Sequence, residues 1–257
     1  MSFIQYSTKN RIATIVLNRP DKRNALNSIM VSELHEALKK AETDDDVKIV
    51  VLKANGDAFC AGADLAYLKE LSKFSYDENL EDSMRLKEMF RQIYVMKKVV
   101  IAQVEGHAIA GGAGLATVCD LVFAVPEAKF GFTEVKIGFV PAIVSIFAIR
   151  KFGESHTKNL LFSGNLITAL NAKEIGMVNF ISDKGNIDNE VDVFAKDLVD
   201  KTSANSLALT KNLINKIQDM DLDYALDYAA ELNALSRGSD DCKRGISAFL
   251  NKKKIVW

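Results

Sequence analysis

The sequence predicts an α/β protein whose carboxyl-terminal part is helical. Through most of the chain, short β-branched runs alternate with segments in which apolar residues recur at helical spacing. Such alternation favours layers of helices and strands joined by right-handed crossovers. Strand signals stop near residue 190, so we expect a core over residues 1–190 and a helical region over residues 191–257.

The first predicted strand runs from Ile12 to Leu17, because its residues are largely β-branched and a turn containing Pro20 follows. A helix comes next, with Asn27 or Ser28 as its N-cap. Its apolar residues at helical spacing are Met30, Leu34, Leu38 and Ala41. The acidic run 44–46 ends this helix, and a second strand is predicted from Ile49 to Leu52.

The middle of the chain continues the alternation. A short helix is predicted over 64–71, and the polar residues 72–82 are expected to form a mobile surface loop. An amphipathic helix over 86–96 and a buried strand over 99–104 follow. The apolar run 137–149 is shorter than the roughly 18 residues of a spanning helix, so we expect a buried segment there.

The last quarter of the chain carries helical periodicity without strand signals. The predicted helices cover residues 192–201, 206–217, 223–236 and 240–250. No linker rich in glycine and serine separates them from the core. We therefore expect no sharp boundary between the core and the helical region near residue 190.

Composition narrows the classes of function. The 33 basic and 34 acidic side chains give a formal net charge of −1, so we expect neither a nucleic-acid partner nor a membrane partner. The amino terminus does not resemble an export signal, which favours a cytoplasmic protein. Cys60, Cys119 and Cys242 are widely spaced, as expected for reduced thiols, and the isolated histidines predict no metal site.

Two loops of small residues are candidates for binding a ligand through main-chain amides. In the first, 59–65, small residues would let the main chain approach a ligand closely, and Asp64 could cap a following helix; the alternative is a plain strand-to-helix connection. The second, 106–116, precedes an apolar stretch that could be helical, and unpaired amides at a helix start stabilise negative charge. The alternative for this loop is that its glycines allow a helix to pack closely against a strand, without a ligand. A dinucleotide motif fits poorly, because Thr117 takes its third glycine position.

Glu134 is the candidate proton-transfer residue. It lies in the largely apolar segment 129–141, and burial among apolar groups raises the pKa of a carboxyl and suits it to proton transfer. A solvated surface glutamate is the alternative.

Several motifs, in this order, resemble those of the crotonase, or enoyl-CoA hydratase/isomerase, superfamily. They lie at residues 18–20, 24–27, 61–65, 106–112, 119–120 and 130–134, followed by Gly245-x-x-Ala248-Phe249-x-x-Lys252-Lys253. The resemblance runs nearly end to end. It implies a spiral of ββα units with a carboxyl-terminal helical trimerisation region, a homotrimer or a dimer of trimers, and acyl-CoA thioesters as substrates.

The resemblance also implies roles for individual residues. The amides of Ala63 and Gly111 would form an oxyanion hole for the thioester carbonyl, and Glu134 would be the acid/base. Substrate contacts are implied for Ala61, Asp64, Leu65, Gly114, Pro141, Arg23, Ala25, Phe249 and Lys252. The last two would reach the adenine end of coenzyme A across a subunit interface. No separate cofactor is implied, because coenzyme A is part of the substrate.

The chain departs from the family pattern at three places. Hydratases with two catalytic glutamates carry one at the position of Gly114, so this chain keeps only Glu134. A family lysine is replaced by Ala66, and Arg23 or Lys22 could take over part of its contact with coenzyme A. Many relatives have a glycine-rich stretch where this chain has 141–145. Together, residues 114–115, 134–138 and 141–145 resemble the bacterial branch assigned to hydration of methylglutaconyl-CoA and related branched enoyl-CoA thioesters.

The sequence therefore predicts a hydratase that acts on a short, branched or carboxylated 2-enoyl-CoA. A single glutamate also allows a Δ3,Δ2-enoyl-CoA isomerase or an acyl-CoA decarboxylase. A third alternative is an acyl-CoA-binding or RNA-binding protein without turnover. A buried Glu134 and the net charge of −1 argue against that alternative.

Overall fold

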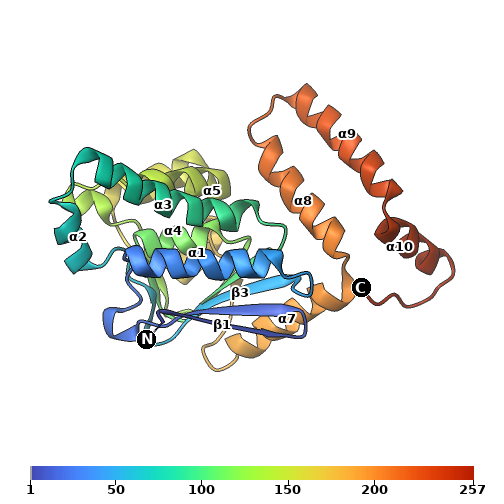
Figure 1. Ribbon diagram of the computed structural model, residues 1–257, viewed down its shortest axis with the longest axis horizontal. Helices are drawn as coiled ribbons and strands as arrows, with labels where there is room; N and C mark the ends of the chain where they lie inside the picture. The colour runs from blue at the N-terminus through green and yellow to red at the C-terminus, as the bar shows by residue number, and fades with distance from the viewer. Residues whose placement is uncertain (1) are drawn as a thin grey trace.

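A six-stranded sheet forms the base of the fold in the computed structural model, which describes residues 2–257 (Figure 1). In sheet order its strands are β1 (Ile4–Lys9), β2 (Ile12–Leu17), β3 (Ile49–Ala54), β5 (Val99–Val104), β7 (Leu121–Ala124) and β10 (Phe180–Ile181). The pair β1 and β2 is antiparallel, and the remaining neighbours are parallel. β5 is buried along its whole length, as predicted for a strand covered on both faces.

A second, four-stranded sheet contains β4 (Ala58–Cys60), β6 (His107–Ile109), β8 (Lys129–Gly131) and β9 (Ile167–Thr168). β4, β6 and β8 run parallel, and β9 is antiparallel to β8. Each of β4, β6 and β8 follows a strand of the larger sheet after a short connection and leads into a helical segment. The chain thus repeats the strand–strand–helix unit of the predicted ββα spiral.

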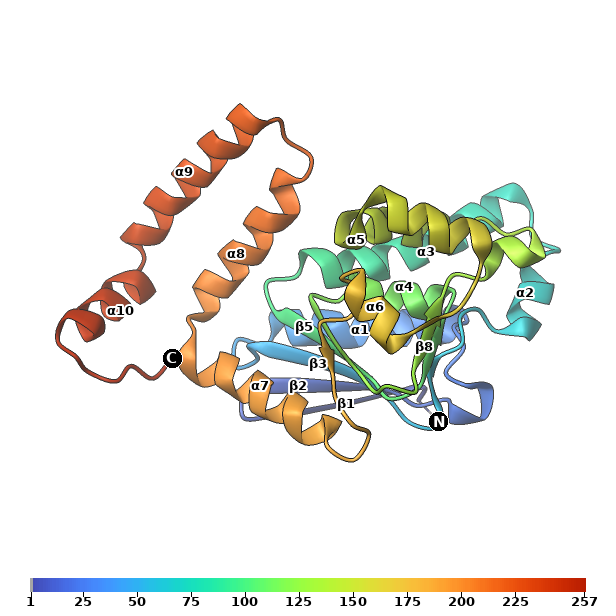
Figure 2. The same cartoon turned by 180° about the vertical axis from the view of Figure 1, so that it is seen from behind.

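Helices cover both faces of the larger sheet (Figures 1 and 2). One face carries α1 (Ser28–Thr43), α3 (Tyr76–Val95), α4 (Gly111–Val118) and α5 (Ala142–Ser163), together with the shorter α2 (Leu65–Leu71) and α6 (Ala169–Glu174). α7 (Ile187–Lys201) lies against the opposite face and contacts β2, β3, β5 and β7. Short 3-10 turns form η1 (Pro20–Lys22) and η2 (Glu134–Ile137).

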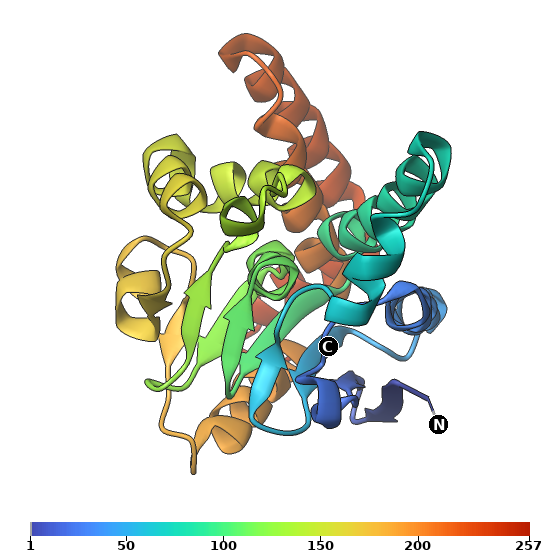
Figure 3. The ribbon, with the colours of Figure 1, turned by 90° about the vertical axis from the view of Figure 1, so that its left-hand side faces the viewer.

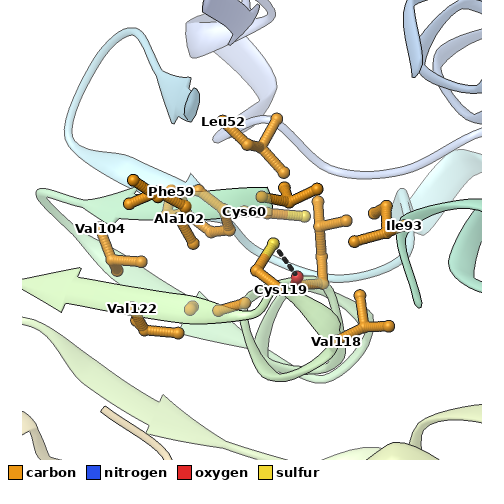
Figure 4. Packing of buried hydrophobic residues seen from close by; sticks show 14 of the residues in the cluster. Leu52, Phe59, Cys60, Ile93, Ala102, Val104, Val118, Cys119 and Val122 are labelled. Atoms are coloured by element: carbon orange, nitrogen blue, oxygen red, sulfur yellow. Dashed lines mark hydrogen bonds between the residues drawn. The ribbon is translucent and has the colours of Figure 1, made fainter. Parts of the chain in front are cut away.

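Both sheets and the helices that cover them contribute to one hydrophobic core. Figure 4 shows its centre, where Leu52, Phe59 and Val104 pack around the buried Cys60 and Cys119. The Cys119 thiol donates a hydrogen bond of 3.2 Å to the Leu115 carbonyl. The thiols are free, as predicted, and burial raises the pKa of Cys60 and of Cys119 to about 12.

The last three helices form an arm that projects from the body on the side away from α2 (Figures 1 and 3). They are α8 (Ala204–Ile217), α9 (Leu222–Gly238) and α10 (Asp240–Leu250). Lys211 anchors α8 because its buried ammonium group donates to the Ile93 carbonyl at 2.9 Å, the Lys98 carbonyl at 3.0 Å and Asp120 Oδ2 at 2.7 Å. α9 and α10 have no buried residue within residues 2–257.

Two predictions about the middle of the chain are wrong. The segment 72–82 is not a loop throughout, because α3 begins at Tyr76 with a capping box in which Ser75 and Glu78 exchange hydrogen bonds. The first turns of α3 are solvent-exposed, which explains their polar composition. The apolar run 137–149 is not a buried segment either: Ile137 and Val140 are 69% and 71% exposed.

Within residues 2–257, none of the helices has both the length and the apolar character required to cross a bilayer.

Candidate active site

Three of the candidate segments lie at one edge of the smaller sheet. β4 ends at Cys60, β6 at Ile109 and β8 at Gly131, and these strands are parallel neighbours, so their carboxyl ends meet. Open α/β sheets commonly bind ligands at such an edge. The two small-residue loops and Glu134 each follow one of these strands.

The first loop leaves the amide of Ala63 without a main-chain partner. Leu26 pairs with the residues on both sides of Ala63: its amide donates to the Gly62 carbonyl at 2.7 Å, and its carbonyl accepts from the Asp64 amide at 2.8 Å. In a trans peptide the N–H points opposite to the C=O of the same unit. The N–H of Ala63 therefore points away from Leu26, and it donates to no acceptor within residues 2–257.

The second loop presents the amide of Gly111 in a similar way. Gly111 is the first residue of α4, whose N-terminal amides have no partner in the preceding turn. The Ala110 carbonyl points into the helix and accepts the Gly114 amide at 3.0 Å, so the N–H of Gly111 points outward along the helix axis. Ala110 has a φ of +51°, an uncommon conformation for a residue with a Cβ.

The two loops are in contact with each other. A Cβ placed on Gly62 would lie 2.9 Å from Ala110 Cβ, 3.0 Å from the Ile109 carbonyl oxygen and 3.6 Å from the Gly111 nitrogen. Gly62 also has a φ of +86°, so this position requires glycine for two reasons. The close approach therefore brings the residue before Ala63 next to the start of α4.

Glu134 begins η2, three residues after β8. Gly131, at the end of that strand, accepts the Ala110 amide at 2.7 Å, which ties this segment to the second loop. Glu134 Oε2 is buried and has no hydrogen-bond partner within residues 2–257. Burial raises the pKa of the Glu134 carboxyl, in agreement with the expectation from its apolar neighbours.

Asp64 is buried and uses both carboxylate oxygens within the protein, and the substrate contact expected for it stays a prediction. Its Oδ1 accepts the amides of Ala66 at 2.7 Å and Tyr67 at 3.2 Å, so it caps α2, and its Oδ2 lies 2.6 Å from the Arg19 guanidinium. Burial alone would raise the pKa of this carboxyl, but the Tyr67 amide and Arg19 outweigh burial and hold that pKa below its ordinary value. The side chain is already fully engaged within the protein.

Gly114 is buried, and the substrate contact expected for it stays a prediction. A Cβ at this position would lie 2.2 Å from Val144 Cγ1 and 3.1 Å from Phe90 Cε1. Val144 is buried and is the third residue of α5, three positions after the buried N-cap Pro141. Its side chain fills the space that any side chain at residue 114 would enter.

The remaining candidates fall into two groups. Ala61, Leu65, Arg23 and Ala25 lie on or beside the first loop, where Leu65 and Arg23 are exposed and Ala25 is buried. Phe249 and Lys252 lie at the end of the arm and are exposed. α10 lies at the opposite end of the molecule from α2, so one subunit does not bring these two residues to its own loops (Figures 1 and 2).

Sequence reasoning missed three residues that shape the site. Arg19 and Leu26 stand in the quoted motifs, but nothing in the sequence shows that they bind Asp64 and the first loop. Asn24 is completely buried, with a φ of +54°, and its amide group donates to the Asn55 and Ala58 carbonyls at 2.8 Å each. The available signal was a polar residue within a run of turn residues. Among residues 2–257 no cluster of ligands suited to a metal ion occurs.

Known proteins match this chain over nearly its whole length. A family profile described as enoyl-CoA hydratase/isomerase matches residues 7–257. A Thermus thermophilus protein with a provisional enoyl-CoA hydratase name is 42% identical, over 95% of this chain and 96% of its own length. A crotonyl-CoA hydratase of Syntrophomonas wolfei is 33% identical, over 96% and 94%. A crystal structure of an enoyl-CoA hydratase from Mycobacterium smegmatis has a TM-score of 0.94 at 29% identity and covers 99% of this chain and 98% of that one.

Proposed function

The chain belongs to the enoyl-CoA hydratase/isomerase family, and we propose that it hydrates a short, branched or carboxylated 2-enoyl-CoA, such as a methylglutaconyl-CoA-like thioester. The observation that carries this proposal is the pair of unpaired amides, from Ala63 and Gly111, on two touching loops. They suit the carbonyl oxygen of a thioester, because hydrogen-bond donors fixed beforehand stabilise the negative charge that develops on that oxygen.

The names of two relatives support the short or carboxylated acyl group that we propose for the substrate. The Syntrophomonas wolfei relative is named for crotonyl-CoA, a short enoyl thioester. An Escherichia coli relative named 2,3-dehydroadipyl-CoA hydratase, a name that denotes a carboxylated substrate, is 32% identical over 98% of this chain and 97% of its own length. Short acyl groups with and without a terminal carboxylate lie within this range. The methylglutaconyl-like assignment itself rests on the resemblance of residues 114–115 and 134–145.

In the proposed reaction Glu134 is the only carboxyl group that moves protons. As the oxygen of a water molecule bonds to C3, Glu134 accepts a proton from that water, and the C2–C3 π electrons move toward the carbonyl to form an enolate. The Ala63 and Gly111 amides hold the enolate oxygen. Protonated Glu134 then delivers its proton to C2, which restores the thioester carbonyl. Burial favours this cycle, because a raised pKa brings the carboxyl closer to the operating pH.

One observation favours isomerisation as a second candidate function. Val144 and Phe90 occupy the space beside Gly114, so no second acid can assist in holding a water molecule there. A single glutamate can take a proton from C2 and return it at C4, which converts a 3-enoyl thioester into the 2-enoyl form without adding water. The same two amides would stabilise the dienolate intermediate.

A homotrimer or a dimer of trimers is part of the proposal. Leu226, Leu235 and Phe249 on the arm are 59%, 66% and 82% exposed in one chain, and an apolar surface of this kind favours burial against another copy. Such an assembly is also what would allow Phe249 and Lys252 to reach the coenzyme A of a neighbouring subunit. A cytoplasmic location stays a prediction.

Three substrates test the proposal. Purified protein is incubated separately with crotonyl-CoA, 3-methylglutaconyl-CoA and a 3-enoyl-CoA, and the absorbance of the conjugated thioester and the product mass are followed. We expect the first two to lose the conjugated absorbance and to gain the mass of one water. Conversion of the 3-enoyl-CoA to a conjugated product of unchanged mass, without hydration of the other two, would establish the isomerase instead.

A further inference from the structure

A buried ion pair lies directly beside the first loop. The side chains of Arg19 and Asp64 are only 14% and 8% exposed, and their closest atoms are 2.6 Å apart. Asp64 follows Ala63 in the chain, and its other carboxylate oxygen caps α2. Surface ion pairs contribute little to a structure, but a pair this enclosed leaves an unpaired buried charge if one partner is removed.

Arg19 also contacts the segment that pairs with the loop. Its guanidinium donates to the Ala25 carbonyl at 3.2 Å, and Ala25 precedes Leu26, whose main chain bonds on both sides of Ala63. One guanidinium therefore holds both partners of the Leu26–Ala63 bridge. The orientation of the Ala63 amide follows from this bridge, because the plane of its peptide unit is fixed by the bond from Leu26 to the Gly62 carbonyl.

We propose that Arg19 and Asp64 are a positioning pair, which fixes the direction of the Ala63 amide so that it can donate to the carbonyl oxygen of the thioester. This inference rests on the proposed function, and neither residue touches the substrate. Arg19 acts through the Asp64 carboxylate and the Ala25 carbonyl, and Asp64 acts through its own main chain. Their loss should weaken stabilisation of the enolate more than binding of the coenzyme A portion.

The test compares four variants. Arg19→Met removes the charge and both hydrogen bonds, and Arg19→Lys keeps the charge. Asp64→Asn keeps a good N-cap side chain but removes the charge that pairs with Arg19. Arg150→Met is the matched control, because Arg150 forms an ion pair with Asp219 that lies away from the two loops.

Two measurements report on the amide directly. One is the split between kcat and KM for hydration. The other is the absorption band of a bound cinnamoyl-CoA thioester, which moves to longer wavelength when donors polarise its carbonyl. We expect Arg19→Met and Asp64→Asn to lower kcat about tenfold to a hundredfold, somewhat less than the loss of a whole oxyanion donor, with KM changed less than about threefold. The red shift should fall by at least half in both. Arg19→Lys should recover most of kcat, and Arg150→Met should change neither quantity.

The outcomes separate this inference from the proposed function. If wild-type protein hydrates enoyl-CoA and folded Arg19→Met keeps the same kcat and red shift, the positioning role is wrong and the function stands. If wild-type protein hydrates none of the substrates but its red shift disappears in Arg19→Met, the function is wrong and the positioning role stands. Should Arg19→Met fail to fold, unchanged kcat and red shift in Asp64→Asn overturn the role.

Discussion

The contact between Gly114 and Val144 predicts a strong energetic coupling between these two positions. A Cβ at residue 114 would lie 2.2 Å from Val144 Cγ1 and 2.9 Å from Val144 Cβ, so trimming valine to alanine is not enough to admit it. The informative pair of substitutions is therefore Gly114→Ala and Val144→Gly. Together they remove the three side-chain carbons of Val144 and add one methyl group on the opposite side of the contact.

The expected magnitudes follow from burial and helix propensity. Val144→Gly removes a buried side chain and places glycine in a helix, which should lower the free energy of unfolding by about 3–4 kcal/mol. Gly114→Ala gains about 1 kcal/mol of helix propensity but forces an overlap that costs about 1–3 kcal/mol or more. In the double variant the overlap is relieved and the new methyl group fills part of the hole. We expect it to be about 2 kcal/mol more stable than the sum of the two single changes predicts.

Urea unfolding of the wild type, the two single variants and the double variant measures this coupling. Additivity of the single effects within about 0.5 kcal/mol would refute the packing described here. The same reasoning applies to the missing second glutamate. Gly114→Glu alone should destabilise the protein without improving hydration of crotonyl-CoA, whereas Gly114→Glu combined with Val144→Gly provides room for the new side chain.

Three further predictions follow from the buried groups. Glu134→Gln should lower kcat at least ~10²-fold, and kcat/KM of the wild type should fall as the pH drops through the raised pKa of Glu134, as a pH–rate profile would show. Because the pKa of Glu134 is raised in the folded state, the folded protein holds the carboxyl proton more tightly than the unfolded chain does, and stability falls as pH rises through that pKa. Glu134→Gln should therefore melt at a higher temperature than the wild type at neutral pH. A lower melting temperature would contradict the burial of this carboxyl group. Lys211→Met should lower the free energy of unfolding by about 3 kcal/mol, because Asp120 and two carbonyls lose their buried partner; a loss below about 1 kcal/mol in a urea titration would show that α8 is held by other contacts. Cys60 and Cys119, whose pKa values are raised to about 12, should react with a thiol reagent only on unfolding, and rapid modification of either, mapped by mass spectrometry, would count against the core packing.

Much of the fold could be predicted because its signals are local. The strands at 12–17 and 99–104 are rich in β-branched residues, and the structure confirms both, with the second one buried throughout. The helix over 64–71 is confirmed with Asp64 as its cap. The segment 72–82 was mispredicted because an exposed helix start and a polar loop have the same composition, and only the Ser75–Glu78 capping box distinguishes them.

The candidate site could be predicted only where main-chain geometry requires particular residues. Gly62 has a positive φ and a close neighbour, so the main chain requires glycine at this position. A glycine among small residues is a signal that the sequence itself displays. The contacts of Arg19 with Asp64 and of Val144 with Gly114 join residues 45 and 30 positions apart. Such pairings depend on how helices and loops pack, and neither spacing nor composition reveals them.

The two proposed hydrogen-bond donors are main-chain N–H groups, so this part of the proposed catalytic site does not depend on any side chain. Replacing Ala63 or Gly111 by most other amino acids leaves the N–H in place, so a survey of side-chain substitutions would not by itself reveal the donor. Proline is the one encoded residue that deletes the donor itself. Backbone chemistry of this kind can persist while the surrounding amino acids drift, provided that the two turns keep their shape.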